Sequence, residues 1–308
     1  MMRPEQQPSD NRPPVWPAFV GFAAVLFAAQ ILGIVVLGTM FAIHLVTTND
    51  APDSKAILAS ILDFVTSPQA LVASAAVSSL TLVGASLIGA RLSKTPATER
   101  LRLAEGRVGW GRAAVASVGV VGISWVFGGL ISALGLEGIG ILHLFEKAFA
   151  KMSPVYIALS ILFIGVTAPI GEEFFFRGFM QTRLAARWKR PLAIATAAAA
   201  FGLMHMDPIQ GTYAFFVGLY LGYVTEATGS IRIAIAGHAI NNCLSVIFAS
   251  GLAGTADPHP STLEKWGAPL IGLVAVTLGV IALKTAKTTQ AQMPLQMSVQ
   301  VVGAEPSE

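Results

Sequence analysis

Charge is the first thing that this sequence lacks. Of its 308 residues only 12% are Asp, Glu, Lys or Arg, whereas 54% are hydrophobic. A soluble domain of this length carries charge on about a quarter of its residues. The composition therefore excludes an ordinary soluble domain and predicts an all-α, polytopic membrane protein.

Cysteine is nearly absent as well. The single cysteine, Cys243, lies in an apolar segment, which excludes an intramolecular disulfide. The net charge is +3, but the basic residues fall in short segments between hydrophobic runs and do not gather on one face. Binding to nucleic acid is therefore not implied.

Long hydrophobic runs take up most of the remaining sequence, and they predict an eight-helix transmembrane bundle. Each run is close to the ~20 apolar residues that cross a bilayer as a helix. Two amphipathic segments, 51–66 and 137–152, are predicted to be interfacial helices. We place the spans at about residues 17–46, 67–90, 113–134, 154–180, 191–206, 209–226, 231–250 and 268–284.

These runs make up one transmembrane domain, over 16–285, between two polar tails. Residues 1–15 are rich in Pro, Gln and Asp and are predicted to be disordered, and 286–308 form a polar C-terminal tail. With both termini cytoplasmic, the inside segments hold 16 of the 20 Lys and Arg residues and the outside segments hold 4. This asymmetry predicts that orientation.

Two adjacent carboxylates interrupt the fourth run. Glu172 and Glu173 follow an uncharged segment, and Arg177 comes one helical turn later. An ionised side chain costs several kcal/mol in hydrocarbon, so such groups face the interior of a bundle or a wet cavity. The spacing of Glu173 and Arg177, with the acid first, favours a structural ion pair. That pairing leaves Glu172 free to face elsewhere.

The other buried polar residues of this half are few: His205, His238, Asn241 and Asn242. His238 and Asn242 are four residues apart and therefore project from one helix face. Glu172 and His205 are equally distant from the basic hairpin tip at 183–190. Antiparallel helices would therefore bring them to the same level, roughly 25 Å below that tip. We expect Glu172, His205, His238 and Asn242 to surround one cavity, in a catalytic half that covers about residues 150–250.

Such a cavity would need water, and Pro169 and Gly171 are expected to permit a kink that admits it. A buried Glu172 can then act as a general base on water, and a neutral histidine can orient that water. An asparagine amide and an imidazole N–H can stabilise an oxyanion. The same Glu172, His205 and His238 can instead bind a zinc ion with an activated water. Both routes lead to amide hydrolysis inside the membrane, and the residues leave the choice open.

Three motifs in order carry a resemblance: Glu172-Glu173-x-x-x-Arg177, Phe201-x-x-x-His205 and His238-x-x-x-Asn242. This set resembles the CAAX prenyl protease and bacteriocin-processing family of intramembrane endopeptidases, also called the type II CAAX protease or abortive-infection family. The resemblance covers about residues 150–250.

The resemblance implies a role for each motif residue. Glu172 corresponds to the catalytic base and His205 to its partner in water activation, while His238 and Asn242 correspond to the oxyanion-binding pair. The remaining motif residues, Glu173, Arg177 and Phe201, correspond to structural positions. Members of the family have been viewed both as metalloproteases and as glutamate peptidases without a metal, so zinc on Glu172, His205 and His238 stays open.

The implied substrate is a hydrophobic peptide or a prenylated, CAAX-like protein. The implied location is a bacterial plasma membrane, with the lipid bilayer as the other partner and the oligomeric state open. The sequence has no His-Glu-x-x-His, Gly-x-Ser-Gly or Gly-x-Gly-Asp motif, which excludes three other intramembrane protease chemistries.

Two other functions fit a membrane bundle with a few buried polar groups. One is a non-catalytic immunity or scaffold protein that keeps the fold. The other is a proton-coupled transporter that uses the acids and histidines as a relay. A transporter would favour inverted halves with broken helices in each, whereas the polar groups of this sequence cluster in one half.

Overall fold

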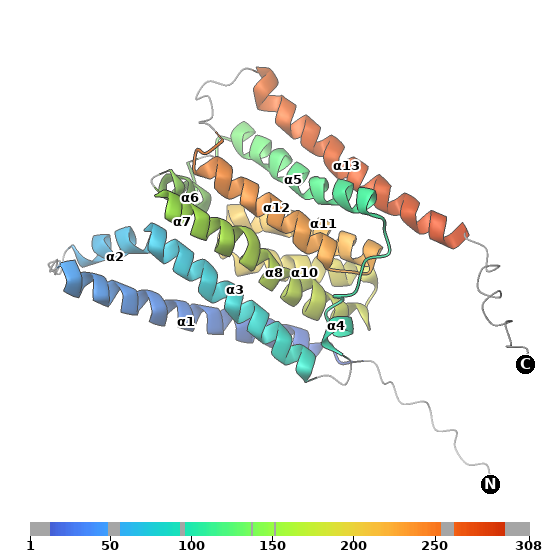
Figure 1. Cartoon of the computed structure of the whole chain (residues 1–308), viewed down its shortest axis with the longest axis horizontal. Helices are drawn as coiled ribbons and strands as arrows, with labels where there is room; N and C mark the ends of the chain where they lie inside the picture. The colour runs from blue at the N-terminus through green and yellow to red at the C-terminus, as the bar shows by residue number, and fades with distance from the viewer. Residues whose placement is uncertain are drawn as a thin grey trace, which may run out of the picture.

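The computed structural model describes residues 13–48, 56–92, 96–136, 138–150, 152–253 and 262–292. All of the secondary structure in these ranges is helical (Figure 1). The elements are α1 (Trp16–Thr48), α2 (Ile57–Val65), α3 (Pro68–Arg91), α4 (Ala97–Arg100), α5 (Trp110–Ala133), α6 (Ile141–Phe149), α7 (Pro154–Ser160), η1 (Ile161–Thr167), α8 (Ala168–Glu172), η2 (Glu173–Gln181), α9 (Thr182–Ala185), α10 (Arg190–Met204), α11 (Pro208–Thr228), α12 (Arg232–Ala249) and α13 (Thr262–Gln292).

Six segments of the described chain are long and apolar enough to cross a membrane. They are α1, α3, α5, α12, the residues 266–285 within α13, and the continuous rod 154–185 that α7, η1, α8, η2 and α9 form together. The prediction of an all-helical, multi-pass membrane protein is therefore confirmed, whereas the count of eight spans is not.

The two predicted spans that are missing from this set are α10 and α11, and the absence of each has a physical reason. The 15 residues of α10 reach only about 22 Å, less than the hydrocarbon thickness of about 30 Å. Helix α11 has 21 residues but contains Gln210, Thr212 and Glu226, and much of it is buried within the protein. An inner helix meets few lipid chains, so its side chains need less apolar character.

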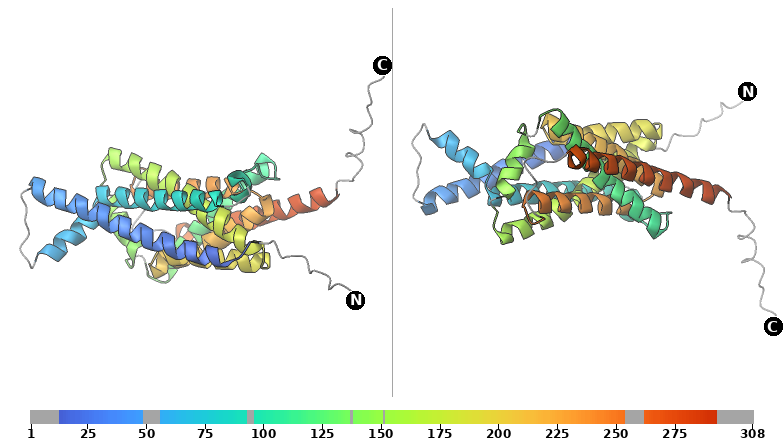
Figure 2. Two further views of the ribbon diagram at one scale, coloured as in Figure 1. Left: turned by 90° about the horizontal axis from the view of Figure 1, so that it is seen from below. Right: turned by 90° about the horizontal axis from the view of Figure 1, so that it is seen from above.

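Successive long helices run in alternating directions (Figure 1). The start of α1 and the end of α13 lie at the same end of the molecule, together with α4, while α2 and α6 lie at the opposite end. Helices α1 and α3 form one flank, α5 and α13 form the other, and the remaining long helices lie between them (Figures 1 and 2).

The predicted interfacial segments are helical over shorter ranges, at α2 and α6, and residues 51–55, 137 and 151 lie outside the described residues. The predicted N-terminal tail falls mostly on residues 1–12, which also lie outside. At the other terminus, α13 continues to Gln292, past the predicted start of the tail at 286, and residues 293–308 are not described.

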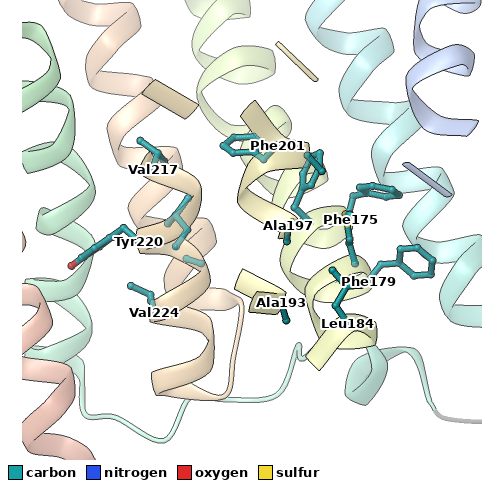
Figure 3. Close-up of a cluster of buried hydrophobic side chains, with 14 of the residues drawn as sticks. Phe175, Phe179, Leu184, Ala193, Ala197, Phe201, Val217, Tyr220 and Val224 are labelled. Carbon is teal, nitrogen blue, oxygen red and sulfur yellow. The ribbon is translucent and has the colours of Figure 1, made fainter. Parts of the chain in front are cut away.

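The core between the inner helices is built from aromatic rings set against small residues. Figure 3 shows Phe175 and Phe179 of η2, Ala193, Ala197 and Phe201 of α10, and Val217, Tyr220 and Val224 of α11 in one cluster. A Cβ on Gly218 of α11 would lie 3.0 Å from the Cβ of Ala198, so glycine and alanine let these helices approach closely, as their sequences indicate.

The flank of α5 and α13 depends on the same kind of contact. A Cβ on Gly122 of α5 would lie 2.5 Å from the carbonyl oxygen of Gly272 on α13, so the two backbones touch. Gly128, also on α5, has no such neighbour within 4 Å.

These two glycines make a matched test of that contact. Gly128→Ala is expected to stabilise the protein slightly, by roughly 0.5–1 kcal/mol, because alanine loses less chain entropy in a helix. Gly122→Ala is expected to destabilise it by about 1–3 kcal/mol, because the methyl group overpacks the interface. The free energy of unfolding of both variants is measured in the same detergent. Equal changes in the two variants would contradict the close packing at Gly122.

Candidate active site

The acidic motif lies on a helix whose hydrogen-bond register changes twice. Two π-helical stretches, η1 and η2, flank the short α8, and Glu173 begins the second. Such stretches occur frequently at functional sites. Gly171 was expected to help a kink, but it is buried against α3 instead, since a Cβ there would lie 2.8 Å from the carbonyl oxygen of Ser79.

The register change frees one backbone carbonyl, that of Ile164. Ala168 donates its N–H to Phe163, five residues back, and the next residue, Pro169, has no N–H to offer. Asn242 of α12 supplies the missing donor, because its Nδ2 lies 3.2 Å from the Ile164 oxygen. The proline therefore creates the acceptor that ties α12 to the acidic helix.

The two neighbouring glutamates have different surroundings. The side chain of Glu173 is 0% exposed, and its Oε1 accepts hydrogen bonds from Arg177 Nη1 at 2.8 Å and from His238 Nδ1 at 2.9 Å. The side chain of Glu172 is 13% exposed, and its Oε2 lies 3.6 Å from His238 Nε2, beyond hydrogen-bond distance. Glu173 is thus enclosed by partners, while Glu172 faces open space.

The Glu173 contact also orients the His238 ring. Because Glu173 Oε1 is an acceptor, His238 Nδ1 is the donor, and Nε2 is the nitrogen turned toward Glu172. A carboxylate behind a histidine fixes its tautomer and its ring plane in many sites. The sequence indicated the pair of Glu173 with Arg177 but not this second contact.

Phe201 lies at the centre of the three motifs. Its ring packs edge-on against His205 and His238, and the guanidinium carbon of Arg177 lies 4.7 Å from its centroid. This cation–π contact places the negative face of the Phe201 ring near the buried Arg177, whose other partner is the Glu173 carboxylate. Phe201 therefore holds residues of all three motifs in contact.

His205 caps the C-terminal end of α10, directly before a tight turn into α11. Its Nδ1 lies 2.9 Å from the carbonyl oxygen of Phe201. A carbonyl can only accept, so Nδ1 carries the hydrogen and Nε2 of a neutral ring keeps a free lone pair. Asp207 begins the next helix by accepting from the N–H groups of Ile209 and Gln210.

One cavity of about 330 Å³ brings the predicted residues together. Glu172, Phe201, His205, His238 and Asn242 all line it, while Glu173 does not. Its other walls come from α1, α3, α6, η1 and α11 and include the side chains of Gln30, Ser78, Gln210 and Tyr213. The first half of the chain thus contributes three helices, α1, α3 and α6, to the cavity.

Behind the cavity is a closed ring of neutral hydrogen bonds. Asn241 Nδ2 donates to the Tyr213 hydroxyl at 2.8 Å, and the Ser124 hydroxyl donates to Asn241 Oδ1. The contact of 2.6 Å between Ser124 and Tyr213 must then use the tyrosine hydrogen, since the serine hydrogen is already donated. Each hydroxyl and the amide are satisfied within this ring.

The ring also fixes the orientation of Asn242. Asn241 Nδ2 donates its second hydrogen to Asn242 Oδ1 at 3.3 Å, so the Asn242 amide nitrogen is the end that faces the Ile164 carbonyl. That nitrogen has one further hydrogen. Sequence reasoning missed Ser124, which lies on α5 without a motif.

The three predicted zinc ligands do not form a metal site in this arrangement. Within the described residues, no three His, Cys, Asp or Glu side chains come close enough together to hold a metal ion. Glu172 Oε2 lies 3.6 Å from His238 Nε2, and each of the two histidines uses Nδ1 in a hydrogen bond, to Phe201 and to Glu173. In this arrangement Glu172, His205 and His238 therefore do not fit a zinc ion.

Residues 154–244 match the family described as type II CAAX prenyl endopeptidase Rce1-like. This match confirms the predicted resemblance over that segment. No curated protein and no solved structure matches the chain.

The Rce1-like segment begins with α7 and ends in α12, so it contains all three motifs and the proline that exposes the Ile164 carbonyl. It excludes α1 and α3, which line the cavity, and α5, which supplies Ser124. The match supports a protease-type segment within a multi-pass membrane protein.

The difference between the two glutamates can be measured as stability. Glu173→Ala is expected to destabilise the protein by about 3–5 kcal/mol, because it leaves Arg177 buried without its anion. Glu172→Ala, which breaks no direct hydrogen bond, is expected to cost roughly 1 kcal/mol. Thermal unfolding in one detergent compares them, and a larger loss in the Glu172 variant would contradict this description of the pair.

Proposed function

We propose that the protein is an intramembrane endopeptidase that hydrolyses a peptide bond with a water activated by Glu172. The observation that carries this proposal is the convergence of one free carboxylate, two histidines and an asparagine on a single cavity of a membrane protein. The Rce1-like match over 154–244 supports the same reaction class.

In this mechanism Glu172 and His205 share the attacking water. The carboxylate of Glu172 takes one proton from the water, and the unprotonated Nε2 of His205 orients it by accepting its other hydrogen. The oxygen then bonds to the carbonyl carbon of the peptide. The proton on Glu172 passes to the leaving nitrogen as the C–N bond breaks, which yields a carboxylic acid and an amine.

The carbonyl oxygen becomes negatively charged during the attack, and two donors are available for it. One is the second hydrogen on Asn242 Nδ2, and the other is Nε2–H of His238 in its doubly protonated form. Glu173 behind the His238 ring accepts from Nδ1 and holds the ring with Nε2 on the side of Glu172. Fixed donors of this kind stabilise an oxyanion without reorganising during the reaction.

The substrate in this proposal is a lipidated, CAAX-like peptide or another hydrophobic peptide. The walls from α1 and α3 support it, because both helices carry exposed apolar side chains and line the cavity as well. A substrate that partitions into the bilayer would therefore reach the cavity from the lipid phase.

The proposed topology has eight membrane-crossing rods, with α10 and α11 as the inner pair and both termini cytoplasmic. The alternation of helix directions supports an even number of crossings (Figure 1). The excess of Lys and Arg in the loops at the end that holds the N-terminal start of α1 supports the orientation.

Glu172→Gln tests the base directly. Amide replaces carboxylate at nearly constant volume, so the loss of a general base is expected to lower kcat by about 10²–10⁴-fold while folding is retained. The assay uses full-length protein in vesicles with a fluorogenic prenylated peptide ending in Cys-aliphatic-aliphatic-X, and an unprenylated apolar peptide beside it. Glu105→Gln, at an exposed loop glutamate, is the matched control.

Unchanged turnover in Glu172→Gln would refute the role of the base. Failure of the wild-type protein to cleave either peptide would contradict the proposed endopeptidase activity on this substrate class.

Tyr213→Phe tests whether the neutral ring positions Asn242. Without the hydroxyl, Asn241 loses its acceptor and the Asn242 amide loses its fixed orientation. We expect kcat to fall on the order of tenfold and KM to stay nearly unchanged. Outright loss of an oxyanion donor lowers kcat more, by about 10²–10³-fold. Tyr156→Phe, a half-buried tyrosine outside the cavity lining, is the control. A change confined to KM would contradict a positioning role.

A further inference from the structure

A second hollow lies on the flank of the molecule, between α1 and α3. Its volume is about 530 Å³, and it borders the catalytic cavity only at Val25. Apart from Thr81 and Arg183, its lining side chains are apolar, and many of them are small: Gly21, Ala24, Ala28, Ala85 and Gly89. This hollow, which we call the α1–α3 groove, has no part in the proposed hydrolysis.

Aromatic rings form the floor of the α1–α3 groove. Phe175 and Phe179 project from η2 on the side away from α11 (Figure 3), and both line the groove. Gly21 and Gly89 flank the Phe179 ring, where added Cβ atoms would lie 3.1 Å and 2.8 Å from it. The glycines therefore let the ring lie flat between two helices and leave a smooth apolar channel above it.

The groove ends at a guanidinium group. Arg183 lies one turn beyond Phe179, with its central carbon 5.3 Å from the ring centroid. Its Nε is buried and has no hydrogen-bond partner among the described residues. A buried donor without a partner calls for an explanation, since such groups are rare in native structures.

A second cation lies beside Arg183. Arg100, in α4, is close enough for the two positive charges to repel each other. Both lie at the end of the molecule that carries the basic hairpin tip at 183–190. An anion between them would relieve the repulsion and accept from the unpartnered nitrogen.

We propose that the α1–α3 groove binds a membrane phospholipid with an anionic headgroup. One acyl chain lies on Phe175 and Phe179 between the two helices, and the phosphate lies against Arg183 and Arg100. Charge complementarity selects this occupant, because a zwitterionic lipid brings its own cation and a neutral apolar chain leaves both arginines unneutralised. Arginine suits the role because its planar fork matches phosphate oxygens.

The test is lipid binding by the delipidated full-length protein in detergent, followed by native mass spectrometry. Dioleoyl phosphatidylglycerol and dioleoyl phosphatidylcholine are offered in equal amounts. We expect a preference of at least about tenfold for phosphatidylglycerol, and Arg183→Gln should remove it, since one charge-assisted hydrogen bond accounts for roughly that factor. Lys189→Gln removes one charge from the same exposed tip and should leave the preference intact.

Filling the groove gives a second, independent measurement. Ala24→Trp places a large ring in the channel from the exposed side of α1, and it should reduce phosphatidylglycerol binding about tenfold or more. Ala23→Trp puts the same ring on the neighbouring exposed position, which does not line the groove, and should have no effect. Unfolding temperatures measured in parallel show whether both variants keep the fold.

Several results would overturn the proposal. Equal binding of the two lipids, or an unchanged preference in Arg183→Gln, would remove the headgroup site. Displacement of the lipid by free glycerol phosphate at equal concentration would show a phosphate site without an acyl groove. Displacement by the prenylated peptide would show that the occupant is a substrate and not a membrane lipid.

Discussion

A buried carboxylate with two cationic or protonatable partners holds the centre of this molecule together. Glu173 has no exposed surface and bridges Arg177 on its own helix to His238 on α12. An ionised group in an apolar interior is tolerated only when its charge is balanced. Glu173 meets this condition through Oε1, which accepts both hydrogen bonds, while its buried Oε2 has no partner among the described residues. The hydrogen bond from His238 to Glu173 therefore ties α12 to η2, and the same contact orients the His238 ring that faces the cavity.

A neutral network complements this charged one on the other side of the cavity. The ring of Ser124, Tyr213 and Asn241 joins three helices, and it continues through Asn242 to a backbone carbonyl that Pro169 leaves without a donor. Each polar atom of the network finds a partner, so the cost of burying it in a membrane protein is largely offset. The cavity thus lies between two rigid supports, and Glu172 is the acid that neither support uses.

The helices outside the Rce1-like segment do more than surround it. Helices α1 and α3 close one side of the cavity, and α5 supplies Ser124 to the network behind it. The two flanks pack differently, since α5 and α13 meet through glycine backbones while α1 and α3 leave a groove over Phe179. The flank of α5 and α13 supports the site through Ser124, and the flank of α1 and α3 carries the proposed lipid groove.

The sequence by itself determined the helical membrane class, the three motifs and the pairing of Glu173 with Arg177, because hydropathy and helical spacing are local properties. The eight-span count from hydropathy is not confirmed at α10 and α11, since hydropathy along the chain does not register that an inner helix is short or shielded. Only the tertiary structure decided that Glu173 also binds His238, that Ser124 and Tyr213 orient the asparagines, and that Gly171 serves packing against α3. These contacts join helices far apart in the chain, and no spacing along one helix encodes the distance between atoms on another.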